Sequence, residues 1–207
     1  GDFTVQFYAN ADYQVERIRN GQIPLWNPYN YAGEPFFANW QLGAWYPPRW
    51  IAAVLWGSSD GWTLEGFMRE VMAHYWLTSI FTYVFLFALT KKHLPAVAGS
   101  LIFTYGSYLT SYPMQQLAIL EGATWLPLTL LGVHLSVTQP HWRLRGIALS
   151  ALALALAVLA GHPQTIMQVG YMTLFYLIFL AWQHKLNLLA LVWRVCLLGL
   201  LGVGLAM

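Results

Sequence analysis

Acidic side chains that could act as a base or a metal ligand are scarce in this sequence and lie mostly near its start. Seven of the eight carboxylic acids precede residue 71, and Glu121 is the last one along the chain. Asp2 has the chemistry of a general base or a cation ligand. The same residue type also suits the N-cap of a helix, so its position alone leaves both interpretations open.

A histidine at a turn is the second candidate group. His162 lies in GHPQ, residues 161–164, between two apolar stretches, with Gln164 close by. An imidazole there could bind phosphate or transfer a proton. Ionisable groups at membrane depth are costly and tend to be functional. The alternative is a plain turn, in which Gly161 ends one helix and Pro163 starts the next.

Residues 21–48 form an aromatic, turn-rich stretch that reads GQIPLWNPYNYAGEPFFANWQLGAWYPP. Flat rings and amide groups can recognise sugars by stacking and by paired hydrogen bonds. The candidates for such contacts are Trp26, Asn27, Tyr29, Asn30, Asn39, Trp40 and Gln41. Tight turns and anchoring at a membrane interface account for most of these residues without any ligand.

The elements that must position these groups are membrane helices. Charged residues make up 9% of the chain and hydrophobic ones 58%, whereas a soluble domain carries about 25% charged residues. Stretches of about 20 apolar residues can cross a bilayer. We predict an all-α, polytopic transmembrane bundle with about six spans, at residues 71–90, 94–112, 118–137, 144–160 and 165–182, and from Leu188 or Val192 onward.

Lysine and arginine orient these predicted spans. They recur at alternate turns, which places them all on one side, at residues 91, 92, 143, 145, 185 and 194. The positive-inside rule makes that side cytoplasmic. Residues 1–70 then form an external loop, and residues 71–207 form the bundle. We expect helices within this loop at residues 4–19 and at 45–56, the second of them interfacial, and we expect the protein to extend beyond both ends of this chain.

Several function classes lack their usual signals. The sequence has no Walker A loop, no dinucleotide glycine fingerprint, no HExxH and no cysteine cluster, so direct use of a nucleotide is unsupported. The chain carries no basic run with interleaved aromatic residues, and we expect no nucleic-acid partner.

The stretch at 21–48, together with WLPLTLL (125–131) and LAGHPQT (159–165), resembles the YfhO family of bacterial membrane proteins. The resemblance implies a GT-C type glycosyltransferase of the bacterial inner membrane, with residues 1–70 on the outer face. Such enzymes move a sugar from a polyprenyl-phosphate donor to a cell-envelope polymer. They keep an acidic residue in the first external loop as base or metal ligand, and Asp2 occupies that place. Dependence on a divalent metal ion stays open, and its ligands stay unassigned.

The resemblance also suggests roles for the candidate residues. Asp2 would be the base, and His162, with Arg49 or Gln164, would contact the lipid phosphate. The aromatic stretch would hold the sugar or the acceptor. Apart from the resemblance, Glu121 is a candidate for substrate binding because acids are so scarce in this part of the chain, and the alternative is a solvated loop acid. Two other classes remain open on the sequence: a lipid or glycolipid transporter or flippase, and a non-catalytic membrane scaffold.

Overall fold

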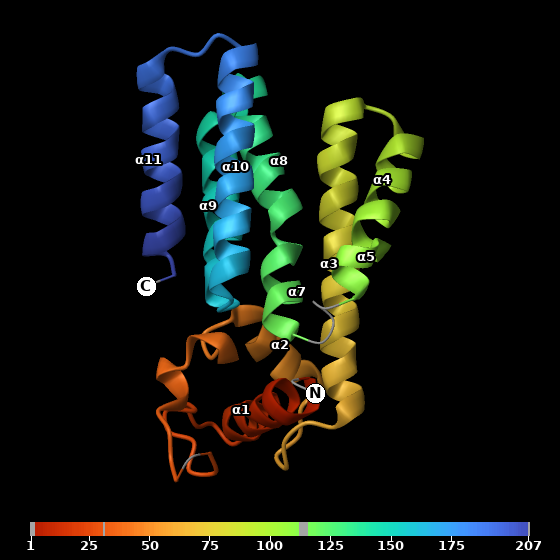
Figure 1. Ribbon diagram of the computed structural model, residues 1–207, viewed down its shortest axis with the longest axis vertical. Coiled ribbons are helices and arrows are strands. Elements are labelled where there is room, and N and C mark those ends of the chain that lie inside the picture. Colours follow the sequence, from red (N-terminus) through yellow and green to blue (C-terminus); the bar gives the residue numbers. More distant parts are fainter. Residues whose placement is uncertain (1–2, 31, 112–115, 207) are drawn as a thin grey trace.

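The computed structural model describes residues 3–30, 32–111 and 116–206. Most of these residues are helical, and none of them forms a strand. They make two layers (Figure 1). Residues 3–30 and 32–63, which we call the cap, lie across one end of a group of long, roughly parallel helices.

The cap contains two α-helices at the positions that the sequence predicts. A π-helix, Phe3–Tyr8, leads into α1, Ala9–Arg19, which ends where Gly21 adopts a left-handed conformation with φ of 69°. Two single 3-10 turns, η2 (Phe36–Ala38) and η3 (Trp40–Leu42), lead to α2, Pro47–Trp56. Proline suits the first turn of α2 because that turn has no use for its missing N–H.

The first long helix is α3, Leu64–Thr90, and it begins where the Thr63 hydroxyl accepts a hydrogen bond from the Gly66 N–H. It contains the whole first predicted span. The next helix, α4, runs from His93 to Tyr105 and is followed by the short α5, Ser107–Thr110. The predicted second span, 94–112, is therefore interrupted, because Gly106 is extended (φ −64°, ψ 161°) and breaks the helix.

The remaining helices run up and down beside one another. They are α7 (Leu117–Thr124), α8 (Leu126–Thr138), α9 (Arg143–Leu159), α10 (Pro163–Gln183) and α11 (Leu188–Gly204), with a 3-10 turn, η4 (Pro140–Trp142), before α9. The α3–α4, α8–α9 and α10–α11 turns all lie at the end of the molecule away from the cap (Figure 1).

Four stretches of the described chain are long and apolar enough to cross a membrane: Leu64–Thr90, Leu117–Thr138, Pro140–Leu159 and Pro163–Gln183. The sequence predicted six. The helix α4 has 13 residues and α11 has 17, which gives α11 a length of about 25 Å against a bilayer core of about 30 Å. The membrane character and the all-helical class are as predicted, and the count of long spans is smaller.

Two buried apolar clusters fix the cap to the bundle. Phe7 and Val15 of the cap pack with Phe67 of α3 and Leu120 of α7 in a single buried cluster. Tyr46, just before α2, belongs to a second cluster that includes residues of α9 and α10. The polar groups of the cap are consequently held in fixed positions over the ends of the membrane helices.

Candidate functional site

A buried charged cluster lies where the cap meets the bundle. Arg49 donates from Nε to Glu70 Oε1 and from a terminal nitrogen to Glu121 Oε1, each at 2.6 Å. The three side chains are between 1% and 5% exposed. Isolated buried charges are very costly, so the pairing explains how these groups tolerate the interior.

Three separate elements bring these charges together. Arg49 lies in the first turn of α2, Glu70 lies in α3, and Glu121 lies in α7. Burial by itself lowers the pKa of Arg49, but Glu121 and Glu70 outweigh this effect and hold that pKa above its ordinary value. The guanidinium is therefore a permanent cation that joins the cap to two helices of the bundle.

A chain of hydrogen bonds runs beside this cluster. Trp125 Nε1 donates to the Tyr46 hydroxyl at 2.9 Å, and this hydroxyl is 2.8 Å from His74 Nε2. His74 Nδ1 is 2.9 Å from the carbonyl oxygen of Glu70. Because a carbonyl can only accept, the network assigns the ring proton to Nδ1 and leaves Nε2 as an acceptor.

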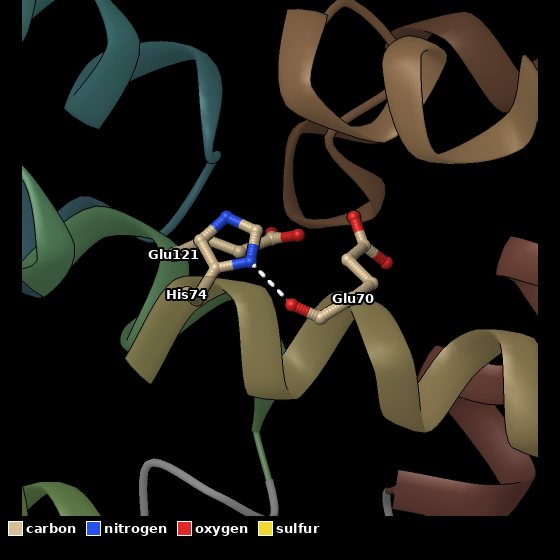
Figure 2. A group of neighbouring side chains, drawn as sticks. All are labelled: Glu70, His74 and Glu121. Atoms are coloured by element: carbon tan, nitrogen blue, oxygen red, sulfur yellow. Dashed lines mark hydrogen bonds between the residues drawn. The ribbon is translucent and has the colours of Figure 1, made fainter. Parts of the chain in front are cut away.

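Glu70, His74 and Glu121 form the one group of metal-ligating side chains found among the described residues. One ligand atom from each lies within 4.8 Å of the other two, and all three residues are buried. Figure 2 shows the three side chains directed toward a common space, two from α3 and one from α7.

A polar pocket lies within the cap, apart from the charged cluster. It has a volume of about 500 Å³ and is lined mainly by amide, carboxylate and phenol groups, from Val5, Gln6, Asn10, Tyr29, Asn30, Glu34, Asn39 and Leu42. We call it the amide pocket. Asn30 Nδ2 donates to Glu34 Oε1 at 3.0 Å and to Asn10 Oδ1 at 3.3 Å. These bonds hold the polar groups in place before any ligand arrives.

His162 and Gln164 line a different, smaller pocket. It measures about 220 Å³ and is also lined by Tyr108, Ser111, Ile119, Thr165 and Gln168. His162 is the N-cap of α10, and its Nδ1 accepts a hydrogen bond from the Thr165 N–H at 3.3 Å. Burial lowers the pKa of His162, so the imidazole is neutral at pH 7 and fits this acceptor role.

The turn around His162 has the form of a plain turn between two helices, as one of the two interpretations of the sequence predicts. Gly161 has a φ of 84°, and Pro163 starts α10. A Cβ at Gly161 would collide with the backbone carbonyl of Trp40, and Trp40 Nε1 donates to the Val158 carbonyl at 3.4 Å. The cap therefore rests directly on the α9–α10 turn, and a hydrogen-bonding imidazole is still present in the pocket.

The other predicted sugar contacts are dispersed. Asn39 lines the amide pocket. Asn27 is 3% exposed and pairs with the backbone of Glu34, so it shapes the pocket without facing it. The Trp26 ring covers Gly33, and Gln41 is exposed. Asp2 lies outside the described residues, and its role stays a prediction.

The structure brings together Arg49 and Glu121, which the sequence marks as candidates without any reason to pair them. Glu70 and His74 are the members of the cluster that sequence reasoning did not select. Their spacing of four residues places both on one face of a helix, and a Glu and a His at that spacing in an apolar stretch was the signal available.

Comparison of the chain with models of known protein families finds no match, and no curated protein or solved structure matches it either. The likeness to the YfhO family therefore rests on the quoted sequence motifs alone, and the function that it implies is a proposal.

Proposed function

We propose that this protein is a membrane glycosyltransferase that moves a sugar from a polyprenyl-phosphate donor to a cell-envelope acceptor on the outer face of the bacterial inner membrane. The observation that carries the proposal is the amide pocket, a sugar-sized space lined by hydrogen-bonding groups in a cap over apolar helices. A lipid-linked sugar has a matching apolar part and polar part, because its lipid chain lies in the bilayer and its sugar hydroxyls need polar partners.

The composition of the amide pocket suits a saccharide. Asn and Gln amides both donate and accept, and a carboxylate accepts, so together they match the mixed character of sugar hydroxyls. Tyr29 is 74% exposed at the edge of the pocket and offers a flat ring. Such a ring can lie against the apolar face of a sugar.

The distribution of cations supports an outward-facing cap. Lys91 and Lys92 lie between α3 and α4, Arg143 begins α9, and Lys185 lies between α10 and α11. These turns are at the end of the bundle away from the cap (Figure 1). Cytoplasmic turns carry an excess of Lys and Arg, so this arrangement favours a cap on the outer face.

The proposal assigns the transfer steps to groups near the cap. Asp2 removes the proton from the acceptor hydroxyl, and the pocket of His162 and Gln164 receives the donor phosphate. Arg49 donates a hydrogen bond to Glu121 in the buried cluster. In this proposal the pair fixes the cap to the bundle. We further propose that the external loop is of the GT-C type. We also propose that residues 94–112 and the chain from Leu188 form further spans, across a bilayer that is locally thinned.

The amide pocket can be tested by substitution in a transfer assay. Asn39→Ala removes one amide from the pocket, and we expect the KM for the saccharide substrate to rise about fivefold to twentyfold, the loss of one or two hydrogen bonds. The measurement is initial rates of sugar transfer by the purified protein in lipid nanodiscs, with matched thermal melting to confirm folding.

Gln183→Ala is the matched control, because Gln183 is an exposed amide at the end of α10 away from the cap. It should leave KM unchanged. If the wild type and Asn39→Ala have equal kinetics with every saccharide that the enzyme transfers, the amide pocket is not part of the substrate-binding site.

A further inference from the structure

We propose that the buried cluster at the junction of the cap and the bundle is a binding site for one divalent cation, with Glu70, His74 and Glu121 as its ligands. The site is separate from the amide pocket and from the pocket of His162, because no residue of the cluster lines either of them. Two observations carry the proposal: the geometry of the donor atoms, and the charge that the cluster leaves uncompensated.

The donor atoms are close to the arrangement that one ion needs. They lie within 4.8 Å of one another, and ligands around an ion with bonds of about 2.0–2.2 Å are separated by roughly 3–4 Å. A shift of about one ångström, within reach of side-chain torsions, would close the site. Two carboxylate oxygens and one imidazole nitrogen suit Mn²⁺ or Zn²⁺.

The charges of the cluster do not balance. When both carboxylates are ionised, Glu70 and Glu121 bring two negative charges against the one positive charge of Arg49. A neutral His74 that donates from Nδ1 to the Glu70 carbonyl adds no charge. Arg49 contacts only Oε1 of each carboxylate. Oε2 of Glu70 is buried without a hydrogen-bond partner. An unsatisfied buried carboxylate oxygen is costly, and a cation is a partner that removes the cost.

His74 is already oriented as metal-bound histidines are. Its Nδ1–H donates to the Glu70 carbonyl, and ligating histidines commonly donate their second ring nitrogen to such an acceptor. The acceptor Nε2 faces the Tyr46 hydroxyl at 2.8 Å. A bound ion would take this lone pair, and the Tyr46 hydroxyl would turn to another acceptor while still receiving the Trp125 N–H.

A bound divalent ion would change the excess charge of the cluster from one negative to one positive. An anionic ligand would then restore neutrality, and a phosphate diester carries the matching single charge. In this respect the inference rests on the proposed function, which supplies a polyprenyl-phosphate sugar, a phosphate diester. Its phosphate would lie in the pocket of His162 and Gln164, which Ile119 of α7 also lines, and would act on the cation through its charge. We therefore expect cation and lipid phosphate to bind cooperatively.

The test is Mn²⁺ binding by the purified protein in nanodiscs, followed by the loss of the free Mn²⁺ signal in electron paramagnetic resonance. We expect one Mn²⁺ per protein, and loss of this site in Glu121→Gln and in Glu70→Gln, which keep the shape of the side chain. A polyprenyl-phosphate sugar should tighten Mn²⁺ binding about tenfold, an ordinary coupling between two ligands.

Glu65→Gln is the matched control, because Glu65 lies on the same helix in an exposed pair with Arg69; it should bind Mn²⁺ as the wild type does. Folded wild type that takes up no stoichiometric Mn²⁺ would overturn the proposal and leave a proton as the balancing charge. Retention of the site in both Gln variants would also overturn it. Mn²⁺ binding without any effect of the polyprenyl-phosphate sugar would keep the cation site and remove its link to phosphate. Bound Mn²⁺ in a protein that transfers no sugar would remove the proposed function alone.

Discussion

At the scale of single residues, Arg49 has the most demanding environment in the described part of the chain. It is 4% exposed and lies between two carboxylates from different helices. Removing one partner of a buried ion pair leaves the other charge uncompensated, so the loss exceeds the worth of the pair itself. Arg49 should therefore matter for stability before it matters for any substrate.

We predict that Arg49→Met lowers the free energy of unfolding by about 3–5 kcal/mol, because Glu70 and Glu121 lose the partner that offsets their burial. Denaturant unfolding in detergent micelles measures this value. Arg69→Met is the control: Arg69 pairs with Glu65 at the surface, and exposed pairs contribute about 0–1 kcal/mol. Similar losses in the two variants would show that Arg49 is not the residue that holds the junction together.

Sequence reasoning selected Arg49 and Glu121 of this cluster but not Glu70 and His74, and it did not predict how these side chains meet. Glu121 stood out because acids are absent from 71–120 and from 122–207, and Arg49 was a candidate for contact with the lipid phosphate. Their contact joins residues 72 positions apart. No helical or strand period relates such positions, so only the packing of α2 against the bundle could reveal it.

At the scale of helices, the backbones of α8 and α9 approach each other closely at two glycines. A Cβ at Gly132 would lie 2.6 Å from both the Gly146 carbonyl oxygen and the Ser150 nitrogen. A Cβ at Gly146 would likewise lie 2.6 Å from the Gly132 carbonyl oxygen and 2.7 Å from the Ser136 nitrogen. Each helix thus carries two small residues four positions apart, a pattern that lets membrane helices pack tightly.

We predict that Gly132→Ala destabilises the protein by about 1–3 kcal/mol, since the added methyl meets backbone atoms that cannot move away. Gly170→Ala is the matched control in α10, where a Cβ meets nothing within 4 Å. There the substitution should stabilise by about 0.5–1 kcal/mol through the higher helix propensity of alanine. Thermal melting of both variants measures the effects, and a neutral Gly132→Ala would contradict the tight α8–α9 contact.

The sequence predicted where the helices lie better than it predicted whether each helix is unbroken. The ranges predicted at 4–19, 45–56, 71–90 and 144–160 all fall on helices. The range 94–112 was read as one span because its residues are apolar throughout, and hydropathy does not register the break at Gly106. Apolar composition indicates that a segment lies in lipid, whereas backbone conformation determines how long each helix in that segment is.

At the scale of the whole molecule, the layout agrees with the charge pattern. The acids of the first 70 residues belong to the cap and the start of α3, and the cation-bearing turns lie at the other end of the bundle. This segregation was visible in the sequence because turns alternate between the two ends of an up-and-down bundle. The pockets were not visible, because they form where separate cap turns and helix ends meet.

The measurement that tests the account most directly is sugar transfer from polyprenyl-phosphate sugars by the purified protein in nanodiscs, with Asp2→Asn assayed beside the wild type. We predict transfer by the wild type, and a loss of at least about 100-fold in kcat for Asp2→Asn with unchanged melting, because general-base contributions are of this order. A folded wild type that binds the lipid and transfers none of the donor sugars offered would contradict the account and favour a transporter or a scaffold.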